Sequence, residues 1–134
     1  PVEAKEKDNL KGYYSKEGSR VEFDDKKRQL KIQTLSEKEA KKLEDFRVSE
    51  PELEKNNTLL MDDKEGTILL QDKNKNYIKF SKDEIVIFGN KKITIESKEV
   101  VIKASKKLIT DTKISELVSS GETKMKGSPI NLNP

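Results

Sequence analysis

Pairs of acidic residues are the groups in this chain whose type and spacing could do chemistry. Asp24-Asp25 and Asp62-Asp63 could serve as a general acid and base, or could bind calcium. Each pair, however, lies between two short apolar runs and next to lysine, as carboxylates do when they accept hydrogen bonds from turn backbone. The Gly-Gly-x-Gly-x-Asp pattern of calcium-binding repeats is absent. We therefore predict a turn at each pair, no metal site and no cofactor.

Nucleophilic chemistry has equally little support. The chain has no His and no Cys, which removes the usual general base, thiol nucleophiles and Cys/His zinc sites. Ser119-Ser120-Gly121 and Gly127-Ser128-Pro129 lack a base, and their glycine spacing does not fit a phosphate loop. We expect both to be chain corners and expect the protein not to be an enzyme.

Lysine pairs could contact phosphate groups. They occur at Lys26-Lys27, Lys91-Lys92 and Lys106-Lys107, but acidic residues are interspersed throughout and the aromatic residues do not cluster. The net charge is only +3. We expect these lysines to form a solvated outer wall, with no nucleic-acid partner.

The composition limits the size of any core. Of 134 residues, 31% are hydrophobic and 40% are charged. Folding must offset roughly 1–2 kcal/mol of backbone entropy per residue, mostly through apolar burial. This chain has little apolar material for that purpose, so we predict a thin core that other chains complete.

Apolar residues alternate with polar ones in most of the chain. Residues 1–12 read as a linker, and the alternation within 13–34 predicts a hairpin that turns at Asp24–Lys27. Residues 35–56 interrupt the pattern as a charged insertion. Ser36 and Glu39 there resemble a capping box, which favours a short helix over about 36–46; an exposed charged loop is the alternative.

A short period appears in the second half. The first apolar residues of successive strands are Ile85, Ile93, Val100 and Leu108, so the steps are 8, 7 and 8 residues. Heptads of a coiled coil place apolar residues three and four apart, whereas here they lie two apart. The period fits a short strand plus a tight corner, and it is clearest over 85–110 and 123–132 but blurs over 111–122.

These patterns predict an all-β fold whose core needs three chains. A strand of three to five residues cannot close a core by itself, whereas three chains wound together as an intertwined triangular β-helix would fill the prism axis. We divide the chain into a β region over 13–80, which contains the insertion, and a trimeric β-helix over 81–134. The expected trimer core is Ile85, Ile87, Ile93, Ile95, Val100, Ile102, Leu108 and Met125.

A family resemblance supports this interpretation. The E-F-D-D hairpin, the Q-D-x-N-x-N-x-I step, the I-x-I-x-(S/A) repeats and the terminal G-S-P-I-N-L-N together resemble the end of a VgrG-type spike protein. Such proteins belong to type VI secretion systems and related contractile injection machines, and are similar to contractile phage tail spikes. The resemblance covers about residues 13–134, apart from the 35–56 insertion. The His-x-His iron site of some phage spikes has no counterpart in this chain, because the chain has no His.

The resemblance implies a structural role. A homotrimer would sit on tube and baseplate proteins, carry a PAAR-type tip protein and effectors, and puncture a target membrane. It would be assembled in the bacterial cytoplasm and then injected; no signal peptide is recognised, and the start at Pro1 suggests a fragment of a longer protein.

The end of the chain has two interpretations. It is either the docking platform for the tip protein or a frayed end, and its residues are Ile130, Asn131, Leu132, Asn133 and Pro134. A trimeric fibre or adhesin that binds a receptor or glycan is the alternative function.

Overall fold

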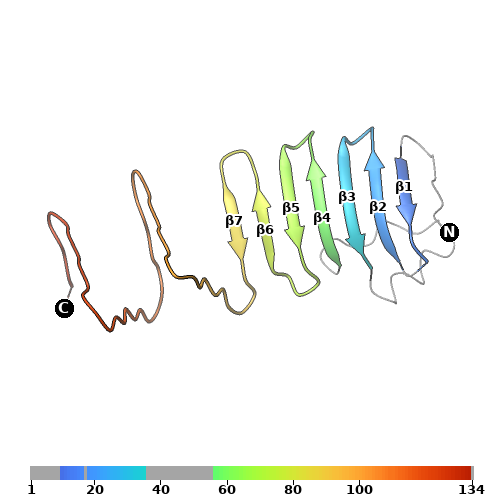
Figure 1. Ribbon diagram of the computed structural model, residues 1–134. Coiled ribbons are helices and arrows are strands. Elements are labelled where there is room, and N and C mark those ends of the chain that lie inside the picture. The colour runs from blue at the N-terminus through green and yellow to red at the C-terminus, as the bar shows by residue number, and fades with distance from the viewer. Residues whose placement is uncertain (1–9, 17, 36–55, 134) are drawn as a thin grey trace. The chain divides into compact units, whose positions relative to one another are not determined.

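The described part of the protein is all-β. The structure is a computed structural model that describes residues 10–16, 18–35 and 56–133, and these residues contain no helix. Figure 1 shows the strands in chain order. They are β1 (Leu10–Tyr14), β2 (Ser19–Asp24), β3 (Gln29–Thr34), β4 (Asn57–Asp62), β5 (Thr67–Gln71), β6 (Tyr77–Phe80) and β7 (Ile85–Phe88).

The seven strands form a single antiparallel sheet in the order β1-β2-β3-β4-β5-β6-β7. Each strand therefore pairs with its neighbours in sequence, which is the simplest way to connect antiparallel strands. Apolar residues alternate with polar ones along β2 and β3, and such a pattern suits a sheet with two different faces. In contrast, β4 and β5 each contain three consecutive apolar residues, and β7 is apolar throughout.

Two of the hairpins turn in the same way. The β2–β3 and β4–β5 turns begin with Asp24 and Asp62, whose Oδ1 atoms accept hydrogen bonds from the backbone N–H three residues on, each at 2.9 Å. Both turns end in the left-handed backbone region, with φ of 55° at Arg28 and 67° at Gly66. The turns predicted at the acidic pairs are thus confirmed, and the first carboxylate of each pair has the backbone role expected of it. The second forms an ion pair instead, Asp25 with Lys11 and Asp63 with Arg28.

The connection between β3 and β4 joins neighbouring strand ends, because Thr34 at the end of β3 pairs with Asn57 at the start of β4. The helix expected over 36–46 lies in this connection, outside the described residues. Elsewhere the strands exceed the expected limits: β1 begins at Leu10, inside the stretch interpreted as a linker, and β7 joins the sheet beyond residue 80.

The chain divides into two compact parts, Pro1–Ile95 and Glu96–Pro134. The first contains the sheet. In the second, described as far as Asn133, the backbone is extended and interrupted by bends, no strand is formed, and every described residue is exposed. Figure 1 accordingly draws the chain after β7 without arrows.

Candidate functional site

Two rows of apolar side chains cross one face of the sheet from β2 to β7. Residues directly paired in antiparallel strands share a face, so the register places the members of each row side by side. The first row is Phe23, Leu30, Met61, Ile68, Phe80 and Ile85. The second row is Val21, Ile32, Leu59, Leu70, Ile78 and Ile87. We call these side chains the apolar face.

The apolar face is open to solvent. Leu70 is 52% exposed, and Ile85 and Ile87 are each 62% exposed. Among the residues that the structure describes, no hydrophobic side chain is buried, so the sheet packs no apolar core of its own. A contiguous uncovered apolar surface of this kind typically marks an interaction site.

A shallow groove follows the second row of the apolar face. Its aliphatic lining is Ile32, Leu59, Leu70, Ile78, Ile87 and, one corner beyond the sheet, Ile93. The row is therefore continued by the first apolar residue after β7. Polar and charged residues also line the groove, among them Asn57, Asp72 and Lys92, so it offers a continuous aliphatic strip with hydrogen-bonding groups beside it.

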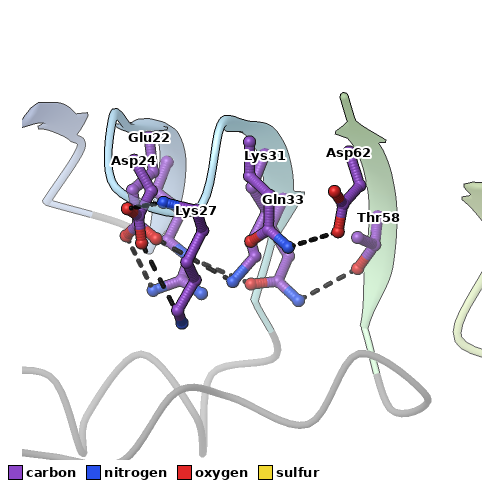
Figure 2. A network of polar contacts seen from close by, with 9 residues as sticks. Glu22, Asp24, Lys27, Lys31, Gln33, Thr58 and Asp62 are labelled. Carbon is purple, nitrogen blue, oxygen red and sulfur yellow. Dashed lines mark hydrogen bonds and ion pairs between the residues drawn. The ribbon is translucent and has the colours of Figure 1, made fainter. Parts of the chain in front are cut away.

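The opposite face carries buried polar side chains, which Figure 2 shows in close-up. We call this set the polar ladder, and its members are between 1% and 8% exposed: Arg20, Glu22, Lys31, Gln33, Thr58 and Asp62. Gln33 lies at its centre. The Gln33 Oε1 accepts from Arg20 Nε at 3.0 Å, and the Gln33 Nε2 donates to Thr58 Oγ1 at 2.9 Å.

Charged members of the polar ladder compensate one another. Glu22 lies between two cations, with 3.4 Å from its Oε2 to Arg20 Nη1 and 3.8 Å from its Oε1 to Lys31 Nζ. Burying charges costs several kcal/mol unless they are paired. Pairing is nearly complete here, although the buried Arg20 Nη2 finds no acceptor. The ladder ties β2, β3 and β4 together at one register.

Asp62 closes the ladder at the turn of β4. Its Oδ1 accepts from the backbone N–H of Glu65, and its Oδ2 accepts from Gln29 Nε2 at 2.6 Å. These hydrogen bonds, that from the Glu65 backbone above all, lower the pKa of the Asp62 carboxyl below its ordinary value. The carboxylate is therefore held ionised and occupied by the turn.

A second polar cluster holds the corner after β7. Asn76 Oδ1 accepts from the backbone N–H of Asn90 at 2.8 Å, and Asn76 Nδ2 donates to Asp72 Oδ2 at 2.9 Å. The hydrogen bonds from Asn76 lower the pKa of the Asp72 carboxyl. At the same corner a Cβ on Gly89 would lie 2.6 Å from Ile93 Cγ1 and 2.8 Å from Lys92 O, so the corner has room only for glycine.

The residues expected to form the trimer core fall into two groups. Ile85 and Ile87 belong to the apolar face, where they pair with Phe80 and Ile78. The remaining six lie after β7 and are each more than half exposed: Ile93, Ile95, Val100, Ile102, Leu108 and Met125. Of these, Ile93 lines the groove together with Ile78 and Ile87.

At the expected docking end, Ile130 is 46% and Leu132 is 83% exposed. Asn131 and Asn133 are exposed as well, and Pro134 lies outside the described residues. The structure thus leaves these residues accessible, without placing a partner on them.

Sequence reasoning missed two features. It named none of the apolar face before Ile85, although apolar and polar residues alternate in most of the chain and Leu59, Met61, Ile68 and Leu70 share that spacing. Equal spacing on either side of the Asp62 turn gives their register and could have revealed the rows. The polar ladder left no such signal, because Arg, Glu and Lys on strands ordinarily face solvent.

No model of a known protein family matches the chain, and no curated protein matches it significantly. Within the described residues, no cluster of three or more acidic, His or Cys side chains could hold a metal ion. Nor do those residues include a helix with the length and apolarity of a membrane span.

Proposed function

We propose that this chain is a structural subunit of a homotrimeric spike whose core is completed by the other two copies. The single observation that carries the proposal is the inverted burial of the sheet. Its polar ladder is buried, while every member of its apolar face, from β2 to β7, is exposed or half-buried. Sheets bury their apolar face, so this face requires a cover.

A second copy of the same chain is the cover that fits best. Aliphatic rows are self-complementary in chemistry, and closed symmetry is the rule among homo-oligomers. Covering the exposed half of one Ile or Leu side chain contributes about 1 kcal/mol, a gain that three identical faces meeting on an axis would multiply. Three faces, rather than two, suit the extended segments after β7, whose corners recur every 7–8 residues and whose apolar residues need an interior.

The biological role that we propose is membrane puncture by a contractile injection or type VI secretion apparatus. This step rests on the likeness of the chain's motifs to VgrG-type spikes, with Ile130–Pro134 as the docking end for a PAAR-type tip protein and with tube, baseplate and effector proteins as further partners. The spike would be assembled in the bacterial cytoplasm and injected. A trimeric fibre or adhesin would use the same trimer.

Analytical ultracentrifugation of the chain tests the trimer. We expect a single species of about 46 kDa, three times the 15.3 kDa of one chain, that persists on dilution. A monodisperse species of 15.3 kDa, or a dimer, would contradict the proposal.

Pull-down with a PAAR-type protein separates the two roles. Retention that is lost when residues 130–134 are removed supports the spike. Saturable binding to a glycan array, with no retention of the tip protein, would instead support the fibre.

A further inference from the structure

Bends divide the chain after β7 at regular intervals. They form two interleaved series, one at 90–91, 105–106 and 120–121 and the other at 98, 113 and 128–129. Positions 90, 105 and 120 are 15 residues apart, and so are 98, 113 and 128. The alternating steps of 7 and 8 residues are therefore halves of one 15-residue repeat. The bends keep this interval through 111–122, where the apolar pattern by itself loses it.

The same repeat can be followed back into the sheet. Four consecutive repeats cover 75–89, 90–104, 105–119 and 120–134, and the β6–β7 hairpin is the first of them. The thirteenth position is aliphatic in all four: Ile87, Ile102, Leu117 and Leu132. The fourth position is Ile78, Ile93, Leu108 and Thr123. Side chains that lie on the apolar face in the first repeat thus have equivalents in the later repeats.

Corners within the later repeats share a hydrogen bond. At the bend of the second repeat, Ser97 Oγ donates to the carbonyl oxygen of Glu99. At the equivalent bend of the third, Thr112 Oγ1 donates to the carbonyl oxygen of Ile114 at 2.9 Å. The first repeat instead closes a hairpin through a backbone hydrogen bond from Ser81 N to Glu84 O at 2.9 Å. The later corners therefore lack the backbone hydrogen bond that closes the first.

Backbone pairing differs accordingly. In the first repeat, β6 pairs with β7 along four residue pairs. Among the described residues 91–133, no backbone group is hydrogen-bonded to another backbone group. Backbone N–H and C=O groups are almost always paired in native proteins once apolar side chains cover them. The extended backbone of the later repeats consequently has no backbone partner on either side, and its row of apolar side chains is uncovered.

The change takes place at the corner of Gly89. Asn76 fixes the Asn90 N–H, and the absence of a side chain at Gly89 lets Lys92 and Ile93 approach closely. The corner therefore fixes where the chain goes after β7, and self-pairing stops there.

We propose that the chain changes pairing partner at Gly89. The strands before this corner pair within one chain, whereas the repeats after it pair with the equivalent repeats of two other copies. This inference rests on the proposed trimer and adds where and how the copies exchange strands. The occupant is another copy because the first repeat already pairs with a strand of its own kind, so an equivalent repeat is the complementary edge. The later repeats of one chain leave that edge open.

Disulfide trapping in the full chain tests the exchange, because the protein has no cysteine of its own. Ile102→Cys introduces a thiol at the aliphatic thirteenth position, and Lys103→Cys, one residue on, places it on the opposite side of an extended segment. Under mild oxidation we expect most of the Ile102→Cys chains to migrate as covalent dimers on a non-reducing gel, and at least tenfold less of Lys103→Cys. Equal cross-linking of the two variants, or none in a species that sediments as a trimer, would overturn the inference.

Hydrogen exchange on the unmodified protein provides a measurement that needs no substitution. We expect amides of residues 92–133 to exchange at least about 100-fold more slowly than in the denatured chain, as amides in core strands do. A trimer in which these amides exchange at denatured-chain rates would disprove the strand exchange but leave the proposed function standing. A monomer would refute both.

Discussion

The β6–β7 hairpin and the chain that follows it place their apolar residues at the same spacing but use their backbone differently. The hairpin satisfies its backbone within the chain, whereas residues 91–133 present only open edges. Side-chain periodicity therefore specifies which face is buried, while the local geometry of the corners decides which strand becomes the partner. In this protein that decision depends on a few groups around Gly89.

The largest expected effect comes from a charge on the apolar face. Leu70→Asp alters a side chain that is already 52% exposed in one chain, so it should be nearly neutral if the chain functions alone. In the proposed trimer it buries three carboxylates at a cost of several kcal/mol, on the order of 3 or more per site, and should abolish assembly. Sedimentation velocity measures the outcome. Lys79→Asp, an exposed residue on the other face, is the control, and unchanged sedimentation of Leu70→Asp would argue against a buried apolar face.

A deletion that respects the repeat should be tolerated better than one that divides it. Removal of residues 105–119 takes out one repeat and keeps the two bend series in phase. Removal of 105–112 joins two half-repeats of the same kind and reverses the order of all later segments. We expect the first variant to remain trimeric with slightly lowered Tm, and the second to lose the trimer or much of its thermal stability. Equal Tm values in differential scanning calorimetry would contradict the 15-residue repeat.

Gly89→Ala tests the corner itself. The added Cβ would meet Ile93 Cγ1 at 2.6 Å and Lys92 O at 2.8 Å, and overpacking of this kind costs about 1–3 kcal/mol. Gly121→Ala is the matched control, because a Cβ there meets nothing within 4 Å. Chemical denaturation should show a lower midpoint for Gly89→Ala alone. If both variants unfold at the wild-type midpoint, the corner does not constrain the chain.

A smaller effect is expected from Asn76→Ala, which removes the acceptor of the Asn90 N–H. Losing such a hydrogen bond costs about 1 kcal/mol. Asn74→Ala is the control, because Asn74 is exposed and keeps its backbone N–H donor to Asp72 Oδ1, whereas the Asn90 N–H donates to Asn76. Hydrogen exchange of the Asn90 amide should accelerate in the first variant and not in the second. The opposite order would show that the Asn76 side chain does not hold the Asn90 N–H.

The smallest effect concerns pH. The Asp62 and Asp72 carboxyls have pKa values below the ordinary 3.8 in the folded chain, so their stabilisation is present above pH 3.8 and is lost as the pH falls through the folded values. Urea midpoints should stay level from neutral pH down to about pH 5 and then decline. Asp72→Asn should make the urea midpoint fall less steeply at acid pH. If the midpoint of this variant falls as in the unmodified protein, the Asp72 carboxylate is not hydrogen-bonded as described.

Much of the sheet was accessible to sequence reasoning. The alternation of Val21 and Phe23 and the acidic turn that follows predict the β2–β3 hairpin, because strand and turn preferences agree there. Leu10 was missed as a strand start, since its neighbours Asn9 and Lys11 are polar and strand ends carry little periodic signal. The helix expected over 36–46 and the identity of the cover on the apolar face stay predictions.

The repeat shows why periodicity has limits. In the third and fourth repeats, Thr110, Ser115 and Thr123 occupy positions that are apolar in the first, so the hydrophobic pattern fades while the backbone keeps its interval. Likewise, the burial of Arg20 and Glu22 depends on what covers their face, which no local pattern encodes. Corner geometry and long-range burial are therefore seen in the three-dimensional structure and not in the sequence pattern.

The constant 15-residue interval also bears on how such a molecule could evolve. A tandem duplication of the codons for one repeat would lengthen the chain and leave both bend series in step, whereas an insertion of any other length would disturb every segment downstream. Selection on length would then act in discrete increments, and homologous chains would be expected to differ by whole repeats rather than by single residues.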